Sequence, residues 1–170
     1  MSDEARKMAV VVVDAQEFFR TWDPPIRDLE AVASRIAGLL DRARDGGVPV
    51  IYVQHLLPDH PGEPMLAEIV PSPGDIIVRK STFDSFQNTT LVEELTSRGI
   101  GHVLFVGFKS DLCLDTACRR ACSQGYKVTL VSDCHATCDN PVIDAGAIER
   151  HTNHTMKHFA EVTASAEVEF

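Results

Sequence analysis

The sequence predicts an α/β fold, a three-layer, doubly wound and mostly parallel sheet of about six strands with helices on both faces. Short runs of β-branched and other apolar residues alternate along the chain with longer segments in which apolar residues recur every three to four positions. The strand-like runs are almost continuously apolar, as is typical of parallel strands that are buried on both faces. Right-handed crossovers between such strands make the sheet doubly wound.

The expected strands and helices alternate in chain order. The first strand is Met8–Val13, which is apolar throughout and ends in four valines. Leu29–Arg44 follows as a helix, because its apolar residues keep a period near 3.6 and Gly46-Gly47 ends it. Further strands are expected at Val48–Val53, Asp75–Val78, His102–Val106, Lys127–Val131 and, as a short sixth, Glu161–Thr163. Further helices are expected at Thr89–Arg98, Asp111–Gln124 and Pro141–His158, the last with a proline in its first turn.

Length and composition place the chain among single-domain globular proteins. Its 170 residues predict one domain, residues 1–170, with a core at about residues 8–163. A net charge of −9 argues against a nucleic-acid partner and favours a small-molecule partner. The longest apolar runs are far too short to cross a membrane, and the first residues, MSDEARK, do not resemble a signal peptide. Five cysteines, an odd number, argue against a disulfide framework, so we expect a cytoplasmic protein.

Reactive side chains follow three of the predicted strands. Asp14 comes directly after the four valines, Lys80 ends the segment IIVRK, and Cys113 lies at the expected start of a helix. In a doubly wound sheet the ligand site lies beyond the carboxyl ends of the strands. If these ends converge, Asp14 can take the thiol proton, Lys80 can orient the carboxylate, and Cys113 can act as a nucleophile. The alternative is a buried Asp–Lys ion pair beside a core cysteine.

These residues lie in segments that resemble a known family. Val11–Phe19 (VVVDAQEFF) resembles the opening of the isochorismatase-like cysteine hydrolase superfamily, and Val78–Phe86 (VRKSTFDSF) resembles its lysine segment. Val106–Ala117 (VGFKSDLCLDTA) is similar to its nucleophile segment. The segments Gly125–Val128 and Ser132–Thr137 resemble its next strand and loop. The resemblance runs from about Met8 to about Val162.

The resemblance implies an activity and roles for the residues. Members hydrolyse C–N bonds in small amides, ureas and carbamoyl compounds, with a cysteine nucleophile that forms a thioester. The roles implied are nucleophile for Cys113, base for Asp14 and third member of the triad for Lys80. The family also implies a cis peptide bond between Phe108 and Lys109, with the backbone N–H groups of Lys109 and Cys113 as the oxyanion hole. Members tend to associate, so we expect a homo-oligomer, a dimer or a tetramer.

Two departures from the family narrow the activity. Nicotinamidases carry a metal-binding Asp-x-His after the second strand, whereas Val53–Leu57 (VQHLL) has no carboxylate, so we expect no catalytic metal. No Gly-x-Gly-x-x-Gly pattern follows a strand, so no nucleotide cofactor is expected either. Isochorismatases that cleave a vinyl ether generally lack the cysteine that is present here as Cys113, so amide chemistry is preferred. Two alternatives stay open. One is a vinyl-ether hydrolase that uses Asp14 as an acid, and the other is a non-catalytic binding protein on the same fold.

Other residues admit a functional and a structural interpretation. Substrate contacts are expected from Phe19, His55, Phe83 and Phe86, although each could be an ordinary structural residue. The loop His55–Gly74, with five prolines and two glycines, is short for the family and leaves the pocket open or closed by a partner chain. Asp111 is expected to cap a helix, and Asp115 to lie in its first turn. Free thiols are expected at Cys118, Cys122, Cys134 and Cys138, the last two in a loop, and a solvent- or subunit-facing stripe at His151, His154 and His158.

Overall fold

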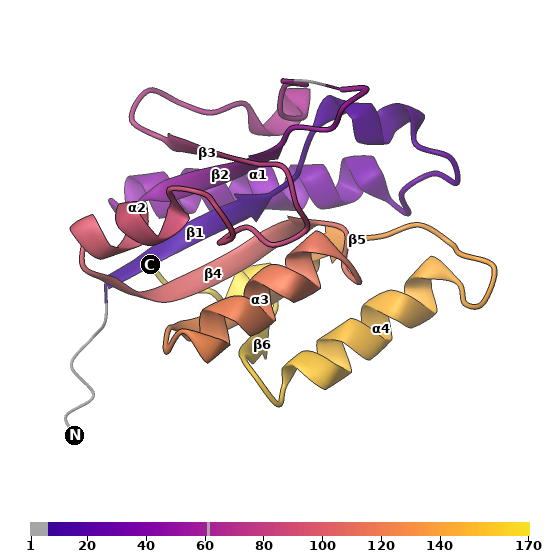
Figure 1. The fold of residues 1–170 in the computed structure, drawn as a ribbon. Helices are drawn as coiled ribbons and strands as arrows, with labels where there is room; N and C mark the ends of the chain where they lie inside the picture. The colour runs from indigo at the N-terminus through magenta and orange to yellow at the C-terminus, as the bar shows by residue number, and fades with distance from the viewer. Residues whose placement is uncertain (1–6, 61) are drawn as a thin grey trace.

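A computed structural model describes residues 7–60 and 62–170. The chain forms one six-stranded parallel sheet in the order β3-β2-β1-β4-β5-β6, with helices on both sides (Figure 1). The strands are β1 (Lys7–Val13), β2 (Val50–His55), β3 (Ile76–Lys80), β4 (Ile100–Phe108), β5 (Lys127–Ala136) and β6 (Glu161–Thr163). The helices are α1 (Leu29–Asp45), α2 (Leu91–Ser97), α3 (Cys113–Ser123) and α4 (Ala145–Met156), and short 3₁₀ turns span Glu17–Thr21, Ala67–Ile69 and Ser165–Glu167. The predicted fold class is confirmed.

The central strand β1 shows why the strands are apolar throughout. Val10 and Val12 point to the face that α1 covers, whereas Val11 and Val13 point to the face covered by α2 and α3. All four side chains are fully buried. Burial on both faces requires apolar residues at every position, and two separate apolar cores result, one on each side of the sheet.

The strand order changes direction between β1 and β4, which lie side by side at the centre of the sheet. The chain leaves β1 for a helix on one face and leaves β4 for a helix on the other, a topology that forms a central crevice beyond the carboxyl ends of the two strands. In this chain buried side chains fill that crevice. Gly107 faces Val13 in this pair and has a φ of 118°. A Cβ atom at residue 107 would overlap the Val13 backbone, so the close approach of these two strands requires glycine.

Most predicted boundaries lie within one or two residues of the observed ones. Four strands, β2 to β5, extend further at their carboxyl ends than predicted. In β2 and β3 the added residues include His55 and Lys80, which pair through their backbones. The strand β5 continues to Ala136, which pairs with Phe108, so the expectation that Cys134 lies in a loop is wrong. Within the described part of the chain, no helix combines the length and hydropathy that crossing a bilayer requires.

The last helix begins later than predicted and does not include Pro141. The Asn140 side chain accepts hydrogen bonds from the backbone N–H groups of Val142 and Ile143, which forms a turn instead of a helix. The helix starts at Ala145, and the Asp144 side chain caps it by accepting from the N–H of residue 147 at 2.8 Å. At the other end α4 stops at Met156, so His158 lies outside it.

Candidate active site

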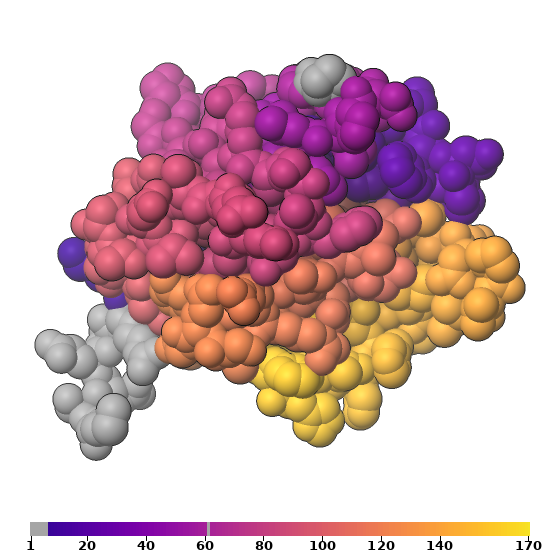
Figure 2. Space-filling model, viewed as in Figure 1, coloured from indigo at the N-terminus to yellow at the C-terminus, as the bar shows by residue number. Residues whose placement is uncertain are grey.

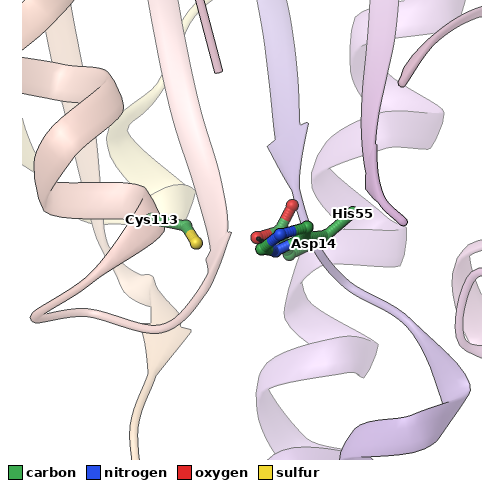
Figure 3. Close-up of side chains that lie close together, drawn as sticks. All are labelled: Asp14, His55 and Cys113. Atoms are coloured by element: carbon green, nitrogen blue, oxygen red, sulfur yellow. Dashed lines mark ion pairs between the residues drawn. The ribbon is translucent and has the colours of Figure 1, made fainter. Parts of the chain in front are cut away.

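Four side chains from different elements meet at the carboxyl edge of the sheet. Asp14 directly follows β1 and has a left-handed φ of 50°. His55 and Lys80 end β2 and β3 and face each other in the strand register. Cys113 is the first residue of α3, across the crevice from the end of β1, and its sulfur points toward Asp14 and His55 (Figure 3).

Asp14 and Lys80 form an ion pair inside the protein. The Lys80 Nζ lies 2.8 Å from the Asp14 Oδ2, and both side chains are at least 98% buried, with relative exposures of 0% and 2%. The same ammonium donates a hydrogen bond to the Phe83 carbonyl at 3.3 Å. A buried carboxylate is costly without a counter-charge, so Lys80 offsets the desolvation of Asp14. The other oxygen, Asp14 Oδ1, is also buried and has no hydrogen-bond partner among the described residues.

Cys113 lies beside this pair as a neutral thiol. Burial, and next the negative charge of Asp14, raise the pKa of Cys113 to about 12, and the positive charge of Lys80 only partly opposes this. The sulfur therefore holds its proton near neutral pH, and a nucleophilic attack requires a base close by. One carboxylate oxygen of Asp14 lies within 4.8 Å of the Cys113 Sγ. Asp14 is thus placed to receive the proton.

His55 lies on the other side of Asp14, and a buried glutamine fixes its position. Its Nδ1 is 3.5 Å from the Asp14 Oδ2. The Gln16 side chain accepts from the N–H of His55 at 2.7 Å and donates to its carbonyl at 3.1 Å, much as a neighbouring strand would. Gln16 was not among the predicted site residues. Only its position two residues after Asp14 hinted at a role.

The segment before Cys113 is tied to its surroundings at several points. The Phe108–Lys109 peptide bond is cis, at the position that the family resemblance implies. The Lys109 carbonyl accepts hydrogen bonds from the N–H groups of Leu112 and Leu114, at 3.1 and 3.3 Å. The Lys109 ammonium lies over the Trp22 ring, 5.7 Å from its centre, and donates to the Cys138 sulfur at 3.0 Å.

A largely buried hydrogen-bonded chain, which was not predicted, supports the same segment. Asn153 donates through Nδ2 to the Ser132 carbonyl, so its Oδ1 is the acceptor for His135 Nε2–H at 3.0 Å. The other ring nitrogen, Nδ1, therefore has no proton and accepts from the Ser110 hydroxyl at 2.8 Å. Burial lowers the pKa of His135, in keeping with a neutral ring. Ser110, next to the cis peptide, is thereby anchored to β5 and α4.

The expected substrate contacts occupy different environments. Phe83 is 57% exposed, and its ring lies 6.2 Å from that of His55, at the edge of the site. Phe19 is buried against Phe108, and Phe86 is a core residue that packs near Tyr126. The short loop His55–Gly74 had suggested a pocket that is either open or closed by a partner chain. In the described residues of the single chain, Asp14, His55, Lys80 and Cys113 are all under 10% exposed, so no open pocket lies over them.

The prediction that Asp111 caps the following helix is wrong. The capping position of α3 is Leu112, and no side chain caps the helix there. Asp111 instead accepts a hydrogen bond from the Thr137 hydroxyl at 2.6 Å, which joins the nucleophile segment to the end of β5. Asp115 does lie in the first turn, where it pairs with Arg119 at 2.7 Å.

The main surface hollows of the described residues are lined by side chains other than Asp14, His55, Lys80 and Cys113. One with a volume of about 710 Å³ lies near the opposite, amino-terminal edge of the sheet, lined by residues that include Met8, His102 and Lys127. The space-filling view likewise shows a closely packed surface over α2 and α3 (Figure 2). Among the described residues, Asp14, His55 and Cys113 are grouped closely enough to share a metal ion, with one ligand atom of each within 4.8 Å of the others.

Comparisons with known proteins agree with this fold. The parallel sheet has the fold of an isochorismatase-like α/β protein. The structure of an isochorismatase from Pseudomonas putida KT2440 superimposes on it with a TM-score of 0.91 at 30% identity, and the match covers 96% of this chain and 90% of that one. A family model described as the isochorismatase domain matches residues 8–167. The chain belongs to the isochorismatase family.

Individual relatives carry names of hydrolases. A streptothricin hydrolase from Streptomyces noursei is 32% identical over 140 residues, which are 78% of this chain and 56% of the relative; a second one is matched over 51% of its length. The chain thus spans about half the length of these two relatives. A ureidoacrylate amidohydrolase from Agrobacterium fabrum is 28% identical over 74% of each chain. The structure of a cysteine hydrolase from Pseudomonas syringae matches with a TM-score of 0.86 at 26% identity, over 95% of this chain and 90% of that one.

Proposed function

We propose that this protein is a cysteine hydrolase that cleaves a C–N bond in a small amide, urea or carbamoyl compound without a cofactor. The observation that carries the proposal is the meeting of a buried Asp14–Lys80 pair with the Cys113 thiol at the central crevice. A carboxylate next to a thiol that keeps its proton is the arrangement that base-assisted thiol attack requires. The hydrolase and amidohydrolase names of its relatives support the same class of reaction.

The proposed reaction has two halves. In the first, Asp14 takes the Cys113 proton while the sulfur attacks the carbonyl carbon, and the N–H groups of Lys109 and Cys113 stabilise the oxyanion. Asp14 then gives the proton to the leaving nitrogen, and the C–N bond breaks to leave a thioester on Cys113. In the second, Asp14 takes a proton from water, which attacks the thioester. The acid product leaves, and the thiol recovers its proton.

Lys80 and His55 contribute charge and shape. Lys80 pairs with the Asp14 carboxylate and orients it through the 2.8 Å contact, so that the other oxygen is available to the thiol proton. His55 and Phe83 border the site and are the side chains that we assign to substrate contact. The single domain, the homo-oligomer and the cytoplasmic location stay predictions.

The test is a Cys113→Ser variant assayed against a panel of small amides and ureas for ammonia or amine release. We expect hydrolysis to fall at least about a thousandfold, because a serine hydroxyl is a far weaker nucleophile in this setting. Intact-protein mass spectrometry of the wild type with a hydrolysed substrate should show an acyl adduct on the peptide that holds Cys113.

The matched control is Cys122→Ser, which changes a partly buried thiol of the same helix and should keep full activity. Hydrolysis by Cys113→Ser at close to the wild-type rate would refute covalent catalysis and favour a vinyl-ether hydrolase with Asp14 as acid. A wild type that hydrolyses nothing in either class would favour a binding protein.

A further inference from the structure

Three side chains at the site bring an oxygen, a nitrogen and a sulfur atom close together. One ligand atom each from Asp14, His55 and Cys113 lies within 4.8 Å of the others, and all three residues are buried (Figure 3). We propose that they form a binding site for a divalent ion of the zinc class, which blocks the nucleophile reversibly. The metal site stands on geometry alone, whereas its inhibitory effect rests on the proposed hydrolase function.

Asp14 has one carboxylate oxygen that a cation can occupy in place of the Cys113 proton. Its Oδ2 is taken by the Lys80 ammonium at 2.8 Å, but its Oδ1 is buried and accepts no hydrogen bond within the described residues. A buried carboxylate oxygen without a partner costs free energy. A cation bound to Oδ1 would satisfy it, and Lys80 could keep its contact with Oδ2.

The other two ligands suit the same ion. Zinc binds imidazole nitrogen, thiolate sulfur and carboxylate oxygen at about 2.0 to 2.3 Å in tetrahedral sites. Ligand atoms in such a site lie about 3.5 Å apart, so these three need to close by no more than about 1.5 Å. Gln16 holds the His55 backbone through two hydrogen bonds, which places the imidazole before any ion arrives.

Charge and proton balance define the binding step. The ion replaces the Cys113 proton: a thiol and Zn²⁺ give a zinc-bound thiolate and one released proton. Asp14 and the thiolate then offset the two positive charges of the ion, and Lys80 leaves a residual charge of +1. A hydroxide or chloride in the fourth position would neutralise it. With the sulfur and the base both engaged, neither can act on a carbonyl, so the bound ion inhibits hydrolysis.

The test uses Co²⁺ as a spectroscopic probe of the purified chain. We expect one equivalent of Co²⁺ to give a thiolate-to-cobalt absorption band, which Zn²⁺ removes by displacement. The band should be absent from Cys113→Ser, and His55→Gln should weaken Co²⁺ binding at least about tenfold. Zinc should suppress hydrolysis in the wild type, and a chelator should restore it. Absence of the band in the wild type overturns the proposal.

A matched control addresses the rival site on the surface. His154 and His158 are exposed, with ring centres 6.4 Å apart, and such a pair can hold zinc weakly. The variant His154→Gln should keep both the band and the inhibition; their loss in this variant would overturn the proposal. The two hypotheses fail separately: a band without any hydrolysis refutes only the hydrolase, and hydrolysis without a band refutes only the metal site.

Discussion

At the residue scale, the proposed mechanism depends on a thiol that keeps its proton and on a carboxylate beside it. Burial and Asp14 both raise the pKa of Cys113, to about 12. In the proposed mechanism the carboxylate that suppresses the resting thiolate also accepts the thiol proton, so the sulfur is activated only when a carbonyl is present. This protects a buried sulfur from chance modification and separates it from cysteine enzymes that hold a preformed thiolate.

This mechanism predicts opposite effects of Asp14→Asn on two measurements. Removal of the negative charge lowers the pKa of Cys113 and raises its thiolate fraction, so iodoacetamide should alkylate Cys113 about tenfold faster at pH 8. Hydrolysis should fall at least about a hundredfold, because the base is lost. Alkylation is measured by mass spectrometry of the Cys113 peptide from pH 7 to pH 10.

In the wild type the logarithm of that alkylation rate should rise by about one per pH unit across this range, because the pKa lies above it. A plateau near pH 8.5 would contradict the raised pKa. The control is Asp115→Asn, which removes the same charge from the first turn of α3 and should leave alkylation of Cys113 within about twofold.

The sequence could predict the site residues that carry charge or reactivity, but not those that hold them. Asp14, Lys80 and Cys113 are conspicuous because each lies at the end of an apolar strand or at the start of a helix. Burial of a polar group at such a place costs free energy unless the group has a partner. The roles of Gln16 and His135 depend on partners 39 and 25 residues away in the sequence. No local pattern specifies such pairs, because the fold alone brings them together.

At the element scale, the crevice depends on how closely β1 and β4 approach. Strand β4 passes Val13 at Gly107, where the register with β5 also shifts, and the chain then turns through the cis peptide toward Cys113. The Gly107–Val13 contact thus contributes to the position of Cys113 relative to Asp14. Sequence patterns locate the two strands but not the irregularity, because a bulge is a property of pairing rather than of hydropathy.

We predict that Gly107→Ala lowers the free energy of unfolding by at least about 2 kcal/mol. The variant combines an unfavourable positive φ of 118° with an overlap between the new Cβ and the Val13 backbone, which a small rotation cannot relieve. Urea denaturation followed by circular dichroism measures the change.

The matched control for that variant is Gly99→Ala. Gly99 also has a positive φ, of 67°, but no atom lies within 4 Å of the place that its Cβ would occupy. Its cost should be about 1 kcal/mol, from backbone strain alone. Equal losses in the two variants would show that the strand contact adds nothing to the strain of residue 107.

The boundaries of helices and strands were harder to predict than their existence. Apolar periodicity locates α4 but does not show that Asn140 forms a turn before it or that Asp144 caps it. The same holds for β5, whose last residues are recruited by pairing of Ala136 with Phe108. Local hydrogen bonds and strand pairing decide these ends, whereas burial decides the elements themselves.

At the scale of the whole molecule, the two cores bury thiols on opposite faces of the sheet. Cys113 and Cys118 belong to the core beneath α2 and α3, and Cys134 to the core beneath α1. Burial raises the pKa of all three, to about 12 for Cys113 and Cys134 and further for Cys118. An ordinary thiol titrates near 8.5. Folding therefore holds three protons that the unfolded chain releases in mild alkali.

The last prediction is a loss of stability as the pH rises from about 8.5 toward 10. In this range the unfolded chain has fewer bound protons than the native state, so the free energy of unfolding decreases with pH, by about 1.4 kcal/mol per pH unit for each such thiol. The stability that these thiols contribute is present in full below the unfolded pKa.

Urea denaturation at a series of pH values measures the slope of this loss, and Cys118→Ala should make the slope about one third shallower. The control Leu114→Val, a cavity variant of the same buried helix face, should lower stability equally at every pH, since it removes no proton. A wild-type stability that stays constant up to pH 10 would contradict the raised pKa values.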